Sequence, residues 1–185
     1  MTKYVAFLRG INILGHNILK MEKLRQQINS LGFKNVSTYK QSGNIIFTTS
    51  NNNSNLINRK IQRELRKLLG VDVKVFLRTM NEVEEIVQLN PFKKVKSNTA
   101  KLYVTFLPAE LSRKHRLPLK STNKDVEVIL LRKCEAFSLA YKKKGRFGYP
   151  TNFIEKKFQV LTTTRNWKTI KGIVSNTQLN IDSSM

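Results

Sequence analysis

The fold is decided by residues 35–49, which read NVSTYKQSGNIIFTT. Valine, threonine, tyrosine, isoleucine and phenylalanine favour β-strands, and they occupy both ends of this stretch. The polar segment Gln41-Ser42-Gly43-Asn44 lies between them and has the chemistry of a tight turn. The stretch therefore predicts a β-hairpin, and a hairpin is the start of an antiparallel sheet.

A helix and a further strand are predicted on each side of this hairpin. Apolar residues recur at helical spacing over 21–31 and over 57–68, and each run stops at a glycine, Gly32 or Gly70. Strand patterns precede the first helix at 3–8 and follow the second at 71–77. The element order is βαββαβ, the order of a ferredoxin-like unit with an antiparallel sheet and two helices on one face.

The pattern partly repeats in the second half of the chain. A short helix around 83–87 and a polar basic connector at 93–100 separate the halves. The elements predicted after the connector are strands at 101–107, 126–131 and 136–141, and helices at 108–117, 151–158 and 166–174. We therefore expect an α+β protein of two ferredoxin-like subdomains with antiparallel sheets, the second a βαββα-type repeat.

The connector also sets the expected boundaries. Residues 1–92 form the first subdomain with its linking helix, 93–176 form the second subdomain, and 177–185 form a polar tail. A chain of 185 residues with 40% hydrophobic content is long enough for one domain or two small ones.

Composition excludes several classes of protein. No apolar run approaches the ~20 residues of a membrane helix, and the apolar stretch at the N-terminus is too short for a signal peptide. The single cysteine, Cys134, cannot form an internal disulfide, which favours a reducing, cytoplasmic location. His16 and His115 are far apart, and Cys134 has no partner at metal-ligand spacing. We therefore predict no metal, no cofactor and no membrane partner.

The charge is the strongest functional signal in the sequence. Lys and Arg number 34 against 12 Asp and Glu, a formal net charge of +22. Both halves are basic, with 14 basic and 6 acidic residues up to Phe92 and 20 and 6 after it. A net charge of this size creates a positive electrostatic field that attracts polyanions, and nucleic acid is the commonest polyanion in a cytosol. Attraction without a biological purpose is the alternative, and both interpretations stay open.

Two segments supply candidate nucleic-acid contacts. Residues 142–149 read KKKGRFGY, and cations that follow phosphates beside aromatic rings that stack on bases are the ingredients of a single-strand binding surface. The predicted helix over 57–68 adds a basic outer face, for which a solvated helix surface is the alternative explanation. The candidates are Arg59, Lys60, Arg63, Lys67, Lys142, Lys143, Lys144 and Arg146.

Residues 9–17 connect the first strand to the first helix and contain two glycines. Glycines let backbone amides approach a ligand, and a helix start favours anions. Arg9, Asn12 and His16 would supply side-chain donors, although the second glycine is not followed by the Lys-Ser/Thr of a P-loop. An ordinary strand-to-helix turn is the alternative.

The start of the last predicted helix is a further candidate. Thr164 has the side chain of an N-cap, and Arg165 would then lie in a first helical turn, where the helix dipole favours anions rather than cations. Such local conflicts occur at working sites, and pairing of Arg165 with an acidic neighbour is the alternative. Trp167, just after it, is expected in the core.

Five segments in this order resemble the motifs of domain-of-unknown-function family 1697. They are Leu8-Arg9-Gly10-Ile11-Asn12, Gln41-Ser42-Gly43-Asn44-Ile45-Ile46-Phe47, Asn90-Pro91-Phe92, Thr151-Asn152-Phe153-Ile154-Glu155-Lys156-Lys157 and Thr163-Thr164-Arg165-Asn166-Trp167. The resemblance implies an uncharacterised bacterial-type cytosolic protein of two ferredoxin-like subdomains. It implies no established activity, substrate or cofactor.

The polar members of these motifs suggest one shared cleft between the subdomains, suited to a small anionic or nucleotide-like ligand. Together with His16, the ligand-binding candidates are Arg9, Asn12, Ser42, Asn44, Asn152, Arg165 and Asn166. A buried hydrogen-bond network is the alternative. Three functions therefore stay open: nucleic-acid binding through the basic surface, an enzyme or sensor for a small phosphorylated ligand, and a purely structural role of the motifs. No convincing general base is present, so no reaction is predicted.

Overall fold

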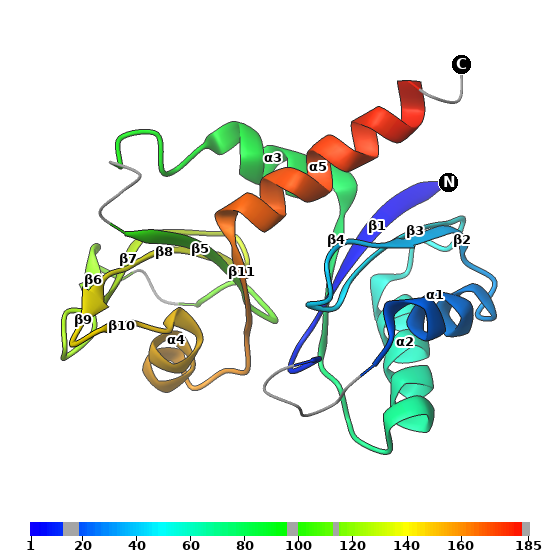
Figure 1. The fold of residues 1–185 in the computed structure, drawn as a ribbon, viewed down its shortest axis with the longest axis horizontal. Coiled ribbons are helices and arrows are strands. Elements are labelled where there is room, and N and C mark those ends of the chain that lie inside the picture. The colour runs from blue at the N-terminus through cyan, green and yellow to red at the C-terminus, as the bar shows by residue number, and fades with distance from the viewer. Residues whose placement is uncertain (13–18, 96–99, 113–114, 183–185) are drawn as a thin grey trace. The chain divides into compact units, whose positions relative to one another are not determined.

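The computed structural model describes residues 1–12, 19–95, 100–112 and 115–182 (Figure 1). Within these ranges the chain is an α+β protein with antiparallel sheets, as the sequence predicted, and it has five helices. It divides into two compact units, Met1–Glu85 and Ile86–Met185. None of the described helices is long and apolar enough to cross a bilayer.

The first unit follows the predicted βαββαβ order. Its elements are β1 (Thr2–Leu8), α1 (Met21–Asn29), β2 (Lys34–Thr38), β3 (Asn44–Thr49), α2 (Ser54–Leu69) and β4 (Val75–Thr79). The strands form one antiparallel sheet in the order β2-β3-β1-β4 (Figure 1). The chain therefore places its first strand in the middle of the sheet, between β3 and β4.

Helix α2 has strong start and stop signals and a buried stripe. The Asn53 side chain accepts hydrogen bonds from the N–H groups of Asn55 and Leu56, which caps the helix start. Gly70 ends the helix in the left-handed conformation, with φ of 71°. Apolar residues of α1 and α2 pack on one face of the sheet; those of α2 are Ile57, Ile61 and Leu65. Burial of this stripe leaves the opposite, basic face of α2 exposed.

The second unit contains a longer series of strands. The division between the units lies within α3 (Met80–Leu89), N-terminal to the boundary expected after Phe92. The later elements are β5 (Lys101–Phe106), β6 (Leu119–Lys120), β7 (Val126–Arg132), β8 (Glu135–Ala140), β9 (Lys142–Lys143), β10 (Arg146–Phe147), α4 (Pro150–Phe158), β11 (Thr163–Asn166) and α5 (Trp167–Asp182). Five strands form an antiparallel sheet in the order β11-β5-β8-β7-β6, and β9 pairs with β10.

Both faces of the five-stranded sheet are packed within the second unit. On one face, Val128, Ala136 and Ile154 form a core that Phe153 and Phe158 of α4 extend. In a second cluster, Phe92 makes edge-on contacts with the rings of Phe137 and Trp167. Trp167 is buried, as the sequence predicted.

Three expectations for the second half were wrong in detail. None of the described residues at 107–118 is helical; Leu111 and Leu117 instead pack on the α4 core from irregular backbone. Thr164 does not cap a helix, and Arg165 does not lie in a first turn, because both belong to β11. Pairing with β5 along the whole of 163–166 provides backbone hydrogen bonds that a helical start would not. Helix α5 continues to Asp182, beyond the end at 174 that was expected for the last helix.

Candidate nucleic-acid interface

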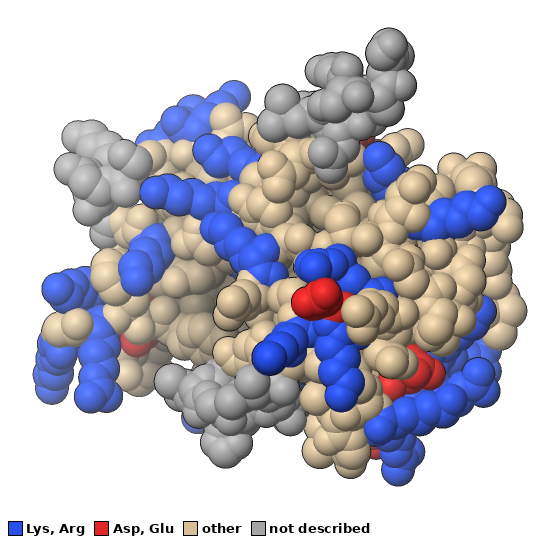
Figure 2. Space-filling model, turned by 45° about the vertical axis from the view of Figure 1, so that its right-hand side comes forward, with Lys and Arg blue, Asp and Glu red and all other residues tan. Residues whose placement is uncertain are grey.

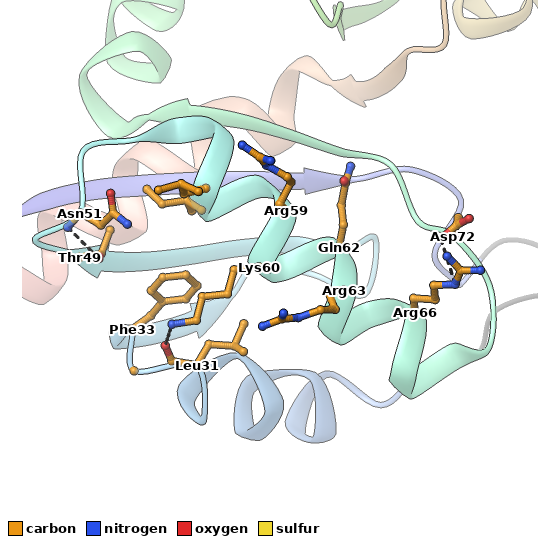
Figure 3. Close-up of a pocket in the computed structure, with 13 residues that line it drawn as sticks. Leu31, Phe33, Thr49, Asn51, Arg59, Lys60, Gln62, Arg63, Arg66 and Asp72 are labelled. Atoms are coloured by element: carbon orange, nitrogen blue, oxygen red, sulfur yellow. Dashed lines mark hydrogen bonds and ion pairs between the residues drawn. The ribbon is translucent and has the colours of Figure 1, made fainter.

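Basic side chains are spread over the visible surface among uncharged residues, with few acidic ones between them (Figure 2). The first unit carries its basic residues beside a groove of about 670 Å³. This α2 groove lies between α2, the segment after α1 and the end of β3 (Figure 3). The lining residues that matter for the argument are Phe33, Leu56, Arg59, Lys60, Arg63 and Arg66. The groove therefore combines an apolar surface with four cations.

The helical repeat brings the three arginines together. Positions 59, 63 and 66 are spaced four and three residues apart, which places them on one face of a helix. Arg59 donates only a long hydrogen bond, 3.4 Å, to the Asn55 carbonyl of its own helix. Arg63 has no hydrogen-bond or ion-pair partner among the residues that the structure describes. These guanidinium groups are available to an anionic ligand.

The other cations of α2 are more occupied. The Lys60 ammonium donates a hydrogen bond to the Leu31 carbonyl and lies 5.5 Å from the centre of the Phe33 ring. In Figure 3, the side chains of Lys60 and Arg63 project toward Leu31 and Phe33, whereas those of Arg59 and Arg66, which also line the groove, project away from these two residues. An exposed ion pair joins Arg66 to Asp72 at 3.5 Å. Pairs of this kind contribute ~0–1 kcal/mol, so a phosphate can compete for Arg66.

The predicted set for α2 overlaps the groove without matching it. Arg59, Lys60 and Arg63 line it, whereas Lys67 pairs with Glu64 at 3.5 Å and is not among the lining residues. Arg66 completes the face and was outside the candidate set. Arg66 lies seven residues, or about two helical turns, after Arg59. This spacing predicts that the two side chains share a helix face, and it would have placed Arg66 in the candidate set.

The second group of predicted cations forms a β-hairpin in the second unit. Strands β9 and β10 pair Lys143 with Arg146 and Lys142 with Phe147. The turn between them is Lys144-Gly145, with φ of 46° and 80°, and two residues with positive φ are the requirement of a type I′ turn. We call residues 142–147 the cationic hairpin. All four of its basic residues, Lys142, Lys143, Lys144 and Arg146, are exposed.

The motif residues of the first unit are occupied by internal contacts. The Asn12 amide donates to the carbonyls of Leu19 (3.0 Å) and Gln41 (2.9 Å), and its oxygen accepts from the Leu19 N–H at 2.7 Å. The buried Asn44 amide donates to the Tyr39 carbonyl and the Ser42 hydroxyl. Both asparagines thus fix the backbone of loops.

Three other candidates belong to the same unit. Arg9 is half-buried, and its backbone N–H donates to the Lys74 carbonyl at 2.9 Å. His16 lies outside the described residues. Ser42 is exposed and accepts a hydrogen bond from Asn44. An amide is no general base, so this contact does not make Ser42 a nucleophile.

The motif residues of the second unit also make local contacts. Arg165 is 7% exposed, and its guanidinium donates to the Thr163 hydroxyl (2.8 Å) and the Thr164 carbonyl (2.9 Å). Burial lowers the pKa of Arg165 to about 10, and the nearby Tyr149 acts in the opposite direction. Asn166 accepts from the Lys168 N–H at 2.9 Å and so caps α5, and Asn152 is exposed on α4. A shared cleft for the motif residues of both units stays a prediction.

Titratable groups elsewhere do not assemble a metal centre within the described parts of the chain, since no three His, Cys, Asp or Glu side chains come together there. A second cavity of about 270 Å³ lies in the second unit, where His115, Glu110, Lys133 and Glu135 are among its lining residues. The sequence did not predict this cavity, because the cavity lies beside the segment that was expected to be a helix.

Comparisons with known proteins place the chain in a family without assigning an activity. No curated protein matches the chain. A solved structure of a conserved bacterial protein from Streptococcus pneumoniae is similar to it, with a TM-score of 0.68 and 22% identity, over 94% of this chain and 97% of that one. The likeness to that structure concerns the fold alone. The pattern of a protein family described as "Protein of unknown function (DUF1697)" matches residues 1–137. The chain therefore belongs to the DUF1697 family.

Proposed function

We propose that the protein binds nucleic acid, with the phosphates of one strand held in the α2 groove. The observation that carries this proposal is the row of Arg59, Arg63 and Arg66 on one exposed helix face beside an apolar surface. Arginine presents a planar fork of donors that matches phosphate oxygens, so three arginines along one face suit a repeating phosphate backbone. The net charge of +22 adds long-range attraction.

The apolar part of the groove contributes in a different way. Leu56 is 49% exposed at the start of α2, beside the first arginine, and Phe33 lies behind Lys60. An exposed aliphatic side chain loses contact with water when a sugar or base covers it, which stabilises the complex in addition to the phosphate contacts. Contacts of this kind do not depend on base sequence, so binding to many sequences is expected.

A small phosphorylated ligand is the second candidate for the same groove. Its volume of about 670 Å³ is within the ~300–1,000 Å³ of small-molecule sites. Asn12 and Asn44 support neither ligand, because their amide groups already bond to internal partners. For these two residues the structural network is the best interpretation.

For the architecture, we propose that each unit is a ferredoxin-like unit. The order β2-β3-β1-β4 with α1 and α2 on one face supports this for the first unit. In the second, β11-β5-β8-β7 has the same sequence of pairings, and α4 corresponds to the second helix. An irregular segment then replaces the first helix.

The test measures binding of a labelled 20-nucleotide strand by fluorescence anisotropy over a salt series. The groove variant replaces Arg59, Arg63 and Arg66 by Gln, and a matched control replaces Lys23, Lys34 and Lys74, which are exposed basic residues of the same unit outside the groove. The slope of log affinity against log salt is expected to fall by roughly one per lost phosphate contact in the groove variant. The control should keep the wild-type slope.

Two outcomes would contradict the proposal. Equal losses in the groove variant and the control would mean that only diffuse charge matters. Affinity that does not change with salt would mean that phosphate contacts are not involved. Displacement of the strand by a micromolar nucleoside monophosphate would favour the small-ligand alternative.

A further inference from the structure

The cationic hairpin ends in one exposed aromatic ring and is followed by a second. Phe147 is 38% exposed and Tyr149 is 53% exposed. Aromatic rings of this size stabilise a fold most when they are buried, so two exposed rings next to four cations need another reason. Rings on which bases stack, beside cations that follow the backbone, are the features of surfaces that bind unpaired strands. In a duplex the base faces are already covered by their neighbours.

We infer that the cationic hairpin binds single-stranded nucleic acid, with bases stacked on Phe147 and Tyr149 and phosphates held by the surrounding basic side chains. This inference rests on the proposed function, because it names the kind of nucleic acid and adds a second surface that takes it. The hairpin and the α2 groove share no residue, so each can be tested separately.

The register of the hairpin places cations on both of its faces. Successive side chains of a strand point to opposite faces, and directly paired residues share one face. Lys142 therefore shares a face with Phe147, and Lys143 shares the other face with Arg146. The Lys101 ammonium lies over one face of the Phe147 ring, 4.2 Å from its centre, so a base would stack on the opposite face of the ring. A base stacked on this ring would have cations beside it for its flanking phosphates.

Backbone hydrogen bonds tie the base of the hairpin to the rest of the second unit. The Tyr141 N–H donates to the Asp125 carbonyl at 2.8 Å, and the Gly148 N–H donates to the Tyr141 carbonyl at 3.2 Å. Gly148 lies so close to the Asp125 carbonyl that no space is left for a Cβ. A surface that is already fixed loses less conformational entropy on binding, which favours affinity.

The experiment compares a 12-nucleotide oligo-dT, a 12-nucleotide oligo-U and a 12-base-pair duplex by fluorescence anisotropy. The variants are Phe147→Leu and Tyr149→Leu, which keep an apolar side chain and remove the ring. Leu161→Ala is the matched control, because it removes an exposed apolar side chain outside the hairpin. Each ring variant is expected to weaken single-strand binding by roughly fivefold or more, and duplex binding by less than about twofold. The control should leave both unchanged.

A thermal melt of each variant establishes whether it is folded. If one of the two ring variants is unfolded, the other still tests the inference. Equal losses for duplex and single strands, or no loss at all, would overturn the inference. A loss of single-strand binding in the ring variants but not in the groove variant would support the inference for the hairpin and overturn the assignment of the α2 groove. The reverse result would keep the proposed function and overturn this inference. Failure of the wild-type protein to bind any strand would overturn both.

Discussion

Gly148 is where a single methyl group should do most damage to the cationic hairpin. The Cβ of Gly148→Ala would overlap the Asp125 carbonyl oxygen and lie 2.7 Å from Cγ2 of Val126. A carbon approaches a carbonyl oxygen to about 3.3 Å, so the chain must move by roughly 1 Å. The oxygen cannot simply rotate away, because it also accepts the Tyr141 N–H.

The cost has two parts. Overpacking of this kind costs about 1–3 kcal/mol, and loss of the Tyr141 hydrogen bond adds about 1 kcal/mol. The sum of about 2–4 kcal/mol corresponds to a fall in Tm of roughly 4–16 °C for a protein of this size. Thermal unfolding followed by circular dichroism measures the fall, and faster hydrogen exchange at the Tyr141 amide locates it.

Gly145→Asn is the matched control in the same hairpin. Gly145 has φ of 80°, and an added Cβ would meet no atom within 4 Å. Asparagine tolerates the left-handed conformation, so the free energy of unfolding of this variant should lie within about 0.5 kcal/mol of the wild-type value. A Gly148→Ala protein as stable as the wild type, or a Gly145→Asn protein as damaged as Gly148→Ala, would refute the close contact with Asp125.

Gly43→Ala should lower the free energy of unfolding by about 1–3 kcal/mol more than Gly32→Ala, as measured by urea unfolding. Both glycines have positive φ, but of the two only Gly43 would bring an added Cβ against the buried Leu8 side chain, at 2.9 Å. Equal urea midpoints for the two variants would contradict the close packing of Gly43 on Leu8. Tyr141→Phe should cost about 1 kcal/mol at pH 8 and progressively less above about pH 10. Burial and the hydrogen bond to Glu127 raise the pKa of Tyr141, so the unfolded state loses its proton first and the contribution to stability is lost as pH rises through the folded pKa. A cost that is constant from pH 8 to 11 would show that the hydroxyl of Tyr141 makes no such contribution.

The first unit was predictable because its signals are local. Apolar stripes at helical spacing, Gly70 as a stop and the turn around Gly43 each specify their own element, and the structure has all of them. The strand β11 was missed because its reason is not local: Thr163–Asn166 are polar or charged, and only pairing with β5, about sixty residues earlier, makes them a strand. Propensity within a short window cannot report a partner so distant in sequence.

The residues of the candidate site also differ in how far the sequence predicts them. Arg59, Lys60 and Arg63 were named from their helical spacing, and helical spacing is what places them along the groove. The hairpin cations were named without any strand being assigned to them, since strands of two residues leave no periodicity to detect. The asparagines were ambiguous, because an amide that saturates backbone groups and one that awaits a ligand look identical in sequence.

The connectivity of the two sheets also sets the order in which they can be completed on the ribosome. All four strands of the first sheet have been made once synthesis reaches Thr79, the last residue of β4. The second sheet gains its edge strand only when Asn166 of β11 has been made. At synthesis rates of ~5–20 residues per second, the intervening stretch takes about 4–17 s. During that interval the nascent chain can hold a complete first sheet, and once β5 has been made at Phe106 one of its edges lacks a partner strand until β11 is translated.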